Sequence, residues 1–352
     1  MTTKVPTRGV LILAGGRGER FWPWSTPSRP KQLLPLAFGG RTLLAATFDR
    51  ALRVATADRV VIMTAESLVE ACRLECPGAI VVGEPVMRNT APAIAAAAAF
   101  FKETDAFAVL PADHAIDNED AFARDFELAF EVAEREDVLV TFAIPAAEPD
   151  PNFGYLQRGA ALADRLFRVA RFTEKPTREK AAEWLAEGGY LWNSGMFVWK
   201  RSTFFDALAA SRPLISAALR GLSFAPGDER AFEQALTQRF PALESISVDY
   251  AVLEHSPNTV AVEAKFDWDD LGSWSAWARR QSRDARGNVV FGDAVVVDCD
   301  DCVVVGEGGI AAAMGLRETV VVHVNGATLA CPLGKSEQVR QVSEAVRARG
   351  AK

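Results

Sequence analysis

A glycine-rich segment with flanking basic residues is the first part of the chain whose composition suggests chemistry. Residues 13–25 read LAGGRGERFWPWS, and residues 29–36 read RPKQLLPL. Glycines directly after an apolar run let backbone N–H groups approach an anion without a side chain in the way. Arg20 and Lys31 add positive charge, which suits a polyphosphate. A glycine turn beside scattered surface charge is the structural alternative.

This loop differs from the two common nucleotide-binding fingerprints. A Walker loop requires GK[ST] after its glycines, and none follows here. A dinucleotide-binding loop opens a helix, which Pro23, Pro27 and Pro30 prevent. The segment therefore predicts an anion-binding loop of another kind. The segment begins with Leu13 and Ala14, which end the apolar run, and with Gly15 and Gly16, which directly follow it.

Two acidic segments could hold a divalent cation. Asp113 follows Pro111 at the end of an apolar run, and Asp270 belongs to DWDDLGSW at residues 267–274. Carboxylate oxygens are ligands that Mg²⁺ prefers, and clustered acids repel one another unless a cation or solvent compensates. A capping role for Asp113 and a solvated acidic turn around Asp270 are the structural alternatives. The two residues are 157 positions apart, so only the fold can bring them together.

Further polar residues are suited to a base or a sugar. The pair Asn89-Thr90 offers amide and backbone groups to a nucleobase, but it is also an ordinary helix N-cap. In FTEKP, at residues 172–176, Glu174 can accept hydrogen bonds from vicinal hydroxyls and Lys175 can neutralise a phosphate. A solvated turn is the alternative there. Asn193, within WNSGMFVW, indicates a buried strand that presents one amide.

The elements that must position these residues alternate between strands and helices. Strands are predicted at 10–14, 59–64, 80–83, 106–110 and 138–144, and helices at 42–55, 91–102 and 120–135. This alternation is typical of βαβ units and of a mostly parallel sheet covered on both faces. Ligands of such sheets bind beyond the carboxyl ends of the strands. The glycine loop and Asp113 both follow predicted strands.

The pattern changes near residue 285. Valine-rich strands split by Gly, Asp and Asn run from 287 to 330, and a closing helix is predicted at 336–347. We therefore expect a catalytic domain at 1–280 and a small β-rich domain, resembling a few rungs of β-helix, at 287–352. Cys299 and Cys302 form a CxxC there. A zinc site needs two more ligands at similar spacing, so two plain thiols beside a turn are favoured.

The ordered motifs resemble those of the sugar-phosphate nucleotidyltransferases. The glycine segment with RPKQLLPL is similar to the family signature, and seven motifs follow the family order over roughly residues 9–275. Segments 111–114 (PADH) and 268–274 match the family's metal-binding motifs. The pattern is most similar to guanylyltransferases that act on mannose 1-phosphate. Glu19 departs from the usual Thr, and we expect its side chain to point away from the ligand.

The resemblance implies an α/β fold, with a Rossmann-like core around a mostly parallel or mixed sheet. It implies transfer of GMP from GTP to mannose 1-phosphate, giving GDP-mannose and diphosphate, without a covalent intermediate. The implied catalytic residues are Arg20, Lys31, Asp113 and Asp270, the last two holding Mg²⁺. The implied nucleotide contacts are Leu13, Ala14, Gly15, Gly16, Glu84, Asn89, Thr90 and Pro111. The implied sugar-phosphate contacts are Gly154, Glu174, Lys175, Asn193 and Asp249.

Composition narrows the alternatives. The 352 residues carry 39 Lys+Arg against 46 Asp+Glu, a net charge of −7, which gives no basic footprint for nucleic acid. No apolar run approaches the ~20 residues that span a bilayer, and no signal-peptide core begins the chain, so we expect a cytoplasmic protein. We also expect no isomerase domain like that of longer relatives. A homodimer, another sugar or nucleotide, and a catalytically silent sugar-nucleotide sensor stay open.

Overall fold

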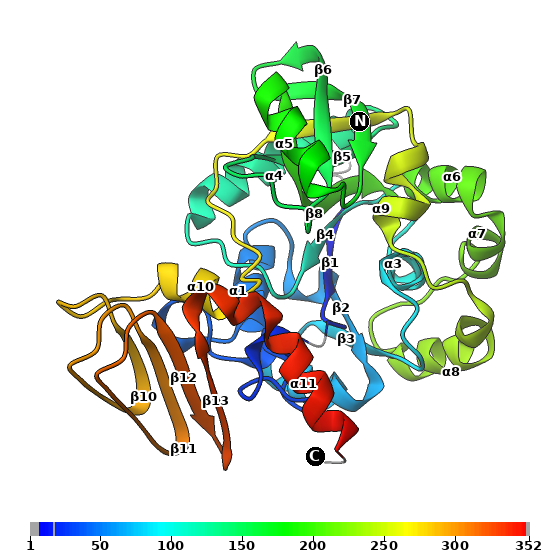
Figure 1. The fold of residues 1–352 in the computed structure, drawn as a ribbon. Helices are drawn as coiled ribbons and strands as arrows, with labels where there is room; N and C mark the ends of the chain where they lie inside the picture. The colour runs from blue at the N-terminus through cyan, green and yellow to red at the C-terminus, as the bar shows by residue number, and fades with distance from the viewer. Residues whose placement is uncertain (1–6, 17, 350–352) are drawn as a thin grey trace. The chain divides into compact units, whose positions relative to one another are not determined.

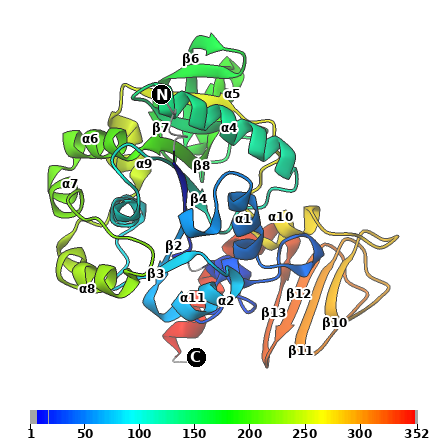
Figure 2. The same cartoon turned by 180° about the vertical axis from the view of Figure 1, so that it is seen from behind.

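The computed structural model describes residues 7–16 and 18–349. Its internal contacts divide the chain into two compact units. The first unit comprises Met1–Gly15, Thr47–Ala112 and Ile116–Trp268, and the second comprises Gly16–Ala46, Asp113–Ala115 and Asp269–Lys352. Figures 1 and 2 show the elements of both from opposite sides. The glycine loop from Gly16 onward and both proposed metal ligands therefore belong to the second unit, together with the C-terminal strands.

A mixed sheet forms the centre of the first unit. Among its described residues, nine strands pair in the order β3-β2-β1-β4-β8-β5-β9-β7-β6. They are β1 (Arg8–Leu13), β2 (Val60–Ala65), β3 (Ile80–Glu84), β4 (Ala106–Pro111), β5 (Leu139–Pro145), β6 (Tyr155–Ala163), β7 (Leu166–Thr173), β8 (Tyr190–Lys200) and β9 (Thr259–Glu263). Strands β1 to β4 run parallel to one another, as the βαβ pattern predicts, but β8 runs antiparallel to β4 and β5. The sheet is therefore mixed rather than mostly parallel.

Helices cover both faces of this sheet (Figures 1 and 2). They are α1 (Leu43–Leu52), whose residues are divided between the units, α2 (Val69–Glu75), α3 (Thr90–Ala97), α4 (Glu119–Arg135), α5 (Arg178–Glu187), α6 (Arg201–Ser211), α7 (Pro213–Leu219), α8 (Glu229–Arg239) and α9 (Val248–Ala251). Buried alanines of α3 share a core with α6 to α9 on one face. On the other face, Phe126 of α4 stacks on Phe142 of β5, with ring centroids 4.2 Å apart. Aromatic packing of this kind is a large contribution to core stability.

Short 3₁₀ helices connect many of these elements. They are η1 (Glu19–Phe21), η2 (Lys31–Leu33), η3 (Phe38–Gly40), η4 (Ala57–Arg59), η5 (Glu66–Leu68), η6 (Ala98–Phe100), η7 (Phe240–Ala242), η8 (Leu253–His255) and η9 (Leu333–Gln338). The helix predicted at 91–102 ends as an α-helix at Ala97 and continues as η6. The closing helix predicted at 336–347 likewise begins as η9.

The second unit contains a four-stranded sheet, preceded by α10 (Trp274–Arg279). Its strands are β10 (Val289–Val297), β11 (Val303–Met314), β12 (Thr319–Val324) and β13 (Ala327–Pro332), followed by α11 (Val339–Ala348). Strands β10, β11 and β12 pair in parallel although only short turns join them, which is the arrangement of a β-helix rung. Strand β13 pairs antiparallel to β12. The predicted β-helix-like unit is confirmed.

The two cysteines of the CxxC lie beside the turn between β10 and β11. Cys299 and Cys302 are both buried, and neither forms a disulfide. Within residues 7–16 and 18–349, no group of three or more His, Cys, Asp or Glu side chains is placed to hold a metal ion. Burial raises the pKa of the Cys302 thiol, which favours an inert buried thiol.

The division of the chain differs from the linear boundary expected at residues 280–287. Residues 21–43 pack with the C-terminal strands through a shared core that includes Phe21, Trp24, Trp274 and Trp277. Trp24 stacks on Trp274 with ring centroids 5.9 Å apart. Aromatic residues of the glycine segment therefore join this segment to the C-terminal part of the chain.

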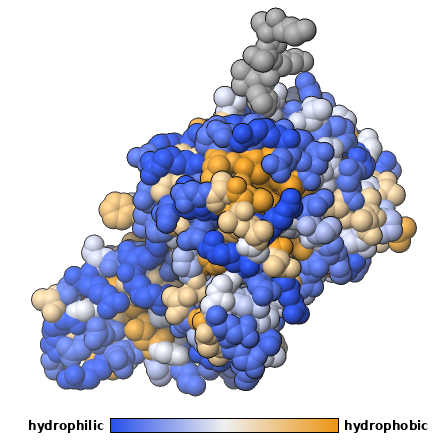
Figure 3. All heavy atoms as spheres, turned by 90° about the horizontal axis from the view of Figure 1, so that it is seen from above, coloured by the Kyte–Doolittle hydropathy of each residue, from blue (hydrophilic) through white to orange (hydrophobic). Residues whose placement is uncertain are grey.

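The outer surface is mostly hydrophilic on the face drawn in Figure 3, which also carries one larger hydrophobic patch. Among the described helices, none combines the length and apolar character needed to cross a bilayer.

Candidate active site

A short backbone bridge brings the two distant carboxylates together in the second unit. The N–H of Ala115 donates to the carbonyl of Asp269 at 2.9 Å, and the N–H of Asp269 donates back to Ala115 at 3.1 Å. Asp113 and Asp270 lie beside this bridge, and both line one cavity. The predicted meeting of two acids 157 positions apart is therefore observed within one unit.

Lys31 joins the two acidic segments. Its side chain is buried, and its Nζ donates to Asp113 Oδ2 at 2.9 Å and to the backbone carbonyl of Asp270. Removal from water would raise the pKa of the Asp113 carboxyl, but the Lys31 ammonium, His114 and the hydrogen bonds to the carboxylate together outweigh this effect and lower the pKa below its ordinary value. Asp113 is therefore ionised at neutral pH.

For the Asp270 carboxyl, the effect of burial on the pKa is larger than the effect of the neighbouring positive charge. Burial raises the pKa of its carboxyl above the ordinary value, although the Lys31 charge opposes the shift. Its Oδ1 accepts a hydrogen bond from the N–H of Gly272 at 3.1 Å. Two carboxylates with oxygen donors suit a hard cation that shares its remaining positions with phosphates and water. The donor set of this cavity therefore fits Mg²⁺.

The cavity has a volume of about 420 Å³ and is positive as well as acidic. Arg20 lines it, and the NH1 group of Arg20 reaches the carbonyl of Gly272 at 3.4 Å. No described carboxylate pairs with this guanidinium. The complete lining consists of Gly18, Glu19, Arg20, Phe21, Lys31, Asp113, His114, Asp270, Leu271, Gly272 and Arg340. A cation without a carboxylate partner in such a cavity suits a phosphate ligand.

The glycine loop approaches Lys31 closely at Gly18, where the backbone conformation also favours glycine. Its φ is 60°, and a Cβ there would lie 2.1 Å from the Cβ of Lys31. Only glycine permits both the left-handed backbone and this close approach. Arg17 of the same loop lies outside the described residues.

The C-terminal strands hold the segment that follows the loop. Glu307 of β11 accepts a hydrogen bond from Trp24 Nε1 at 2.7 Å and also pairs with Arg29. Sequence motifs did not predict this role, because Glu307 lies outside every recognised motif. Trp24 and Arg29 flank the loop and Lys31, so β11 contributes to their placement.

The residues predicted to bind a sugar phosphate gather in the first unit. Asn193 lies on β8, and its Nδ2 donates to Asp249 Oδ1 at 3.0 Å. The hydroxyl of Thr141 donates to Oδ1 of Asn193 at 2.8 Å. The N–H of Asn193 donates to the carbonyl of Gly154 at 2.8 Å. These bonds fix the orientation of the Asn193 amide.

Glu174 and Lys175 complete this sugar-phosphate cluster. A Cβ at Gly154 would lie 2.6 Å from Glu174 Oε2, so the carboxylate lies directly over the glycine backbone. Lys175 Nζ donates to Glu174 Oε1 at 2.7 Å. Burial and the Glu174 charge raise the pKa of Asp249 to about 7, although Lys175 opposes the shift. An added cation or hydroxyl donor would therefore be stabilised here.

The residues predicted to bind the nucleotide follow parallel strands of the first unit. The N–H of Ala14 donates to the carbonyl of Met63 at 2.8 Å, and the N–H of Ala112 donates to the carbonyl of Leu13 at 3.0 Å. The start of the loop and Pro111 therefore lie together at the carboxyl ends of neighbouring strands. Glu84 ends β3, and a Cβ at Gly15 would lie 3.5 Å from its Oε1. Leu13, Ala14, Gly15, Pro111 and Glu84 thus lie at neighbouring strand ends.

Asn89 and Thr90 are placed differently. The Asn89 side chain caps α3 by accepting from the Thr90 N–H at 2.8 Å, and its φ is 66°. Thr90 Oγ1 accepts from the N–H of Val248, next to Asp249, at 2.8 Å. Within the described residues, no hydrogen bond joins either one to the glycine loop. The structural N-cap role is therefore observed, and base contact stays a prediction.

Glu84 predicts a pH-dependent stability. Burial raises the pKa of its carboxyl to about 7, against a lowering by the backbone of Arg88. Between the ordinary pKa and 7 the native state keeps the proton that the unfolded state releases, so stability falls as pH rises. We therefore expect the free energy of unfolding of Glu84→Gln, measured in urea, to rise relative to that of the parent protein as the pH increases. The difference should grow by about 2–3 kcal/mol between about pH 4 and about pH 8. Glu66→Gln, at an exposed position, should show no such trend, and parallel curves for Glu84→Gln would contradict the burial argument.

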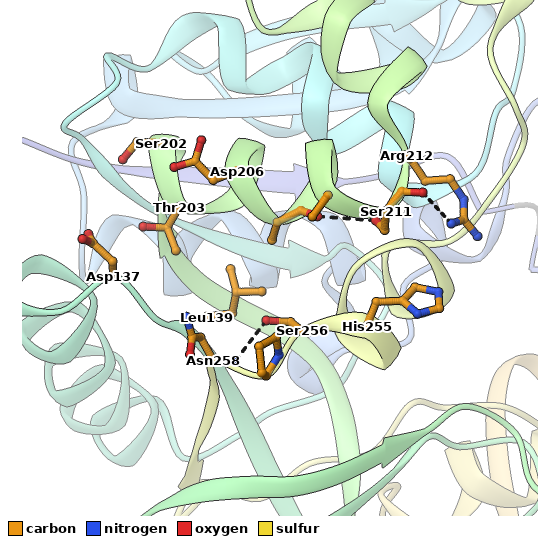
Figure 4. A pocket seen from close by; sticks show the side chains of 13 residues that line it. Asp137, Leu139, Ser202, Thr203, Asp206, Ser211, Arg212, His255, Ser256 and Asn258 are labelled. Atoms are coloured by element: carbon orange, nitrogen blue, oxygen red, sulfur yellow. Dashed lines mark hydrogen bonds between the residues drawn. The ribbon is translucent and has the colours of Figure 1, made fainter.

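A second cavity, of about 610 Å³, lies elsewhere in the first unit. In Figure 4, Asp137, Thr203 and Asp206 lie toward one end and Arg212 and His255 toward the other. Its charged side chains are already ion-paired, as Asp137–Lys200, Asp206–Arg220 and Arg212–Glu244. Among the residues that the structure describes, the Asp and Arg side chains lining this cavity therefore all have ionic partners, whereas Arg20 has none.

The fold and the phosphate-suited cavity agree with the comparisons with known proteins. A family model described as nucleotidyl transferase matches residues 9–286, and one described as MannoseP isomerase/GMP-like beta-helix domain matches residues 292–345. The chain belongs to the nucleotidyl transferase family.

Individual proteins of known name are similar to this chain over most of its length. The chain is 37% identical to the mannose-1-phosphate guanylyltransferases of Escherichia coli and Klebsiella pneumoniae, over 95% of this chain and 73% of each relative. A crystal structure named mannose-1-phosphate geranyltransferase, from Thermus thermophilus, superposes with a TM-score of 0.85 at 32% identity. That match covers 97% of this chain and 99% of the other.

Proposed function

We propose that this protein transfers GMP from GTP to mannose 1-phosphate, giving GDP-mannose and diphosphate. One observation carries the proposal: Lys31, Asp113 and Asp270 line a single cavity together with Arg20, which pairs with no carboxylate of the described residues. The chain is also 37% identical to relatives with this activity in their names. A sensor without catalysis would not need both carboxylates, which makes the enzyme the favoured function.

The chemistry requires positioning and charge neutralisation more than acid–base catalysis. A phosphate oxygen of the sugar phosphate attacks the α-phosphorus of GTP in line, forming one P–O bond as the bond to diphosphate breaks. The attacking oxygen is already ionised at neutral pH, so no general base is needed. Arg20 and Lys31 would neutralise charge on the triphosphate and on the departing diphosphate.

Asp113 and Asp270 would hold Mg²⁺. When bound, the ion supplies positive charge to the reacting phosphates. Lys31 keeps Asp113 ionised and holds the Asp270 backbone, so it prepares both ligands.

The remaining predicted residues would bind the two substrates. The glycine-loop backbone at Leu13–Gly16 and Pro111 would contact the nucleotide, and Glu84, Asn89 and Thr90 would meet its base. In the sugar-phosphate cluster, Glu174, Asn193 and Asp249 offer hydrogen-bonding groups to hydroxyls above the Gly154 backbone. Lys175 would pair with the sugar phosphate.

Diphosphate release, measured with Mg²⁺ across a grid of nucleoside triphosphates and hexose 1-phosphates, tests the proposal. We expect the maximum at GTP with mannose 1-phosphate. A maximum elsewhere would keep the reaction but overturn the base or sugar assignment. A flat grid with GDP-mannose still bound would replace the enzyme by a sensor.

Lys175→Ala tests the sugar-phosphate cluster separately. Loss of one charge-assisted contact should raise the KM for mannose 1-phosphate about 10- to 100-fold, with little change in the KM for GTP. Lys180→Ala is the matched control, because Lys180 is also an exposed lysine paired with a glutamate. An unchanged KM for mannose 1-phosphate would remove Lys175 from the sugar site.

A further inference from the structure

The cavity that holds Lys31, Asp113 and Asp270 has one wall that no family motif supplies. Within the described residues, its lining comes from positions 18–31, 113–114 and 270–272, with the single addition of Arg340. Arg340 lies in α11, the last helix of the described chain. The C-terminal helix thus contributes a cation to the same cavity as Arg20.

The terminal nitrogens of Arg340 are available to a ligand. Its Nε donates to Glu344 Oε1 at 2.9 Å and lies 3.4 Å from Glu19 Oε2. Its NH1 and NH2 groups donate no hydrogen bond to any described residue. A guanidinium held at Nε keeps its outer edge free, and this edge matches phosphate geometry.

Glu19 links this helix to the glycine loop. Its side chain is only 17% exposed and accepts from Arg347 NH2 at 2.7 Å, with Arg340 on its other oxygen. Glu19 begins η1 and directly precedes Arg20. The acid was expected to point away from the ligand; it lines the cavity, and its carboxylate is directed to the two arginines of α11.

We propose that Arg340 is a further phosphate-binding residue, which contacts the triphosphate and the departing diphosphate. Glu19 and Arg347 are positioning residues, because their ion pair holds α11 against η1 and so places both Arg340 and Arg20. The proposal rests on the proposed function only in requiring a nucleoside triphosphate as substrate. It makes the C-terminal helix part of the reacting site.

The test measures binding of inorganic diphosphate with Mg²⁺ by calorimetry, beside the kinetics. Arg340→Gln should weaken diphosphate binding and raise the KM for GTP about 10- to 50-fold, while the KM for mannose 1-phosphate stays constant. Arg340→Lys should recover part of the loss, which a merely structural role would not do. Arg349→Gln, at an exposed position after the same helix, is the matched control.

The positioning pair is tested by a double-mutant cycle. Glu19→Gln and Arg347→Gln should each weaken diphosphate binding by about 3- to 10-fold, and the double variant no more than either alone. Equal binding by Arg340→Gln and Arg349→Gln would overturn the phosphate role, and additive effects would overturn the positioning role. Inorganic diphosphate carries neither base nor sugar, so a wrong substrate assignment would leave these results unchanged.

Discussion

Asp113→Asn and Asp270→Asn should each lower kcat by about 10³-fold or more, because each removes one of two proposed metal ligands. Asparagine keeps an oxygen that can accept from Lys31 Nζ, which donates to Asp113 at 2.9 Å. The buried ammonium therefore keeps a hydrogen-bond partner, and the variants should fold. Steady-state diphosphate release across a Mg²⁺ titration is the measurement, and higher Mg²⁺ should recover part of the loss.

The matched control is Asp293→Asn. Asp293 is an exposed acid on β10 in the same unit, so it reproduces the change in net charge without touching the cavity. Its kcat should equal that of the parent protein. Near-parental turnover by either cavity variant, with an unchanged melting temperature, would remove the metal role of that carboxylate.

Gly18→Ala should be nearly as damaging. The left-handed backbone costs an alanine about 1 kcal/mol, and a Cβ at 2.1 Å from Lys31 cannot be accommodated without movement of that lysine. Lys31 holds both acidic segments, so its displacement should lower kcat by about 10²-fold or more. Steady-state kinetics with chemical denaturation separates the catalytic loss from the loss of stability.

Gly39→Ala separates the two causes. Gly39 also has a positive φ, of 72°, but a Cβ there would meet no atom within 4 Å. It should therefore cost stability without a loss of kcat. If Gly39→Ala and Gly18→Ala lower kcat equally, close approach to Lys31 is not the reason for the glycine.

The C-terminal strands matter for the glycine loop beyond the one arginine of α11. Trp24 stacks on Trp274 and donates to Glu307, and Arg29 pairs with the same carboxylate. These contacts hold the segment between the loop and Lys31. Strand β11, through Glu307, and α10, through Trp274, therefore support the loop with a buried aromatic contact and a partly exposed ionic one.

Local patterns in the sequence predicted the first half of the chain well. Strands β1 to β5 and helices α1, α3 and α4 lie within a few residues of their expected bounds, because hydrophobic periodicity and strand-flanking glycines are local signals. The antiparallel course of β8 between β4 and β5 was not predictable in this way. Strand direction depends on which distant segments pair, and no local pattern records that.

From the sequence alone we predicted which groups form the site: the glycine loop, Lys31, the two separated aspartates and the sugar-phosphate cluster. Their types and order follow from the chemistry that each segment can perform. The tertiary structure brings Asp113 and Asp270 into one cavity, because a backbone bridge between Ala115 and Asp269 closes a span of more than 150 residues. It alone placed Arg340 there, since charge complementarity with Glu19 acts across folded contacts that spacing along the chain does not reveal.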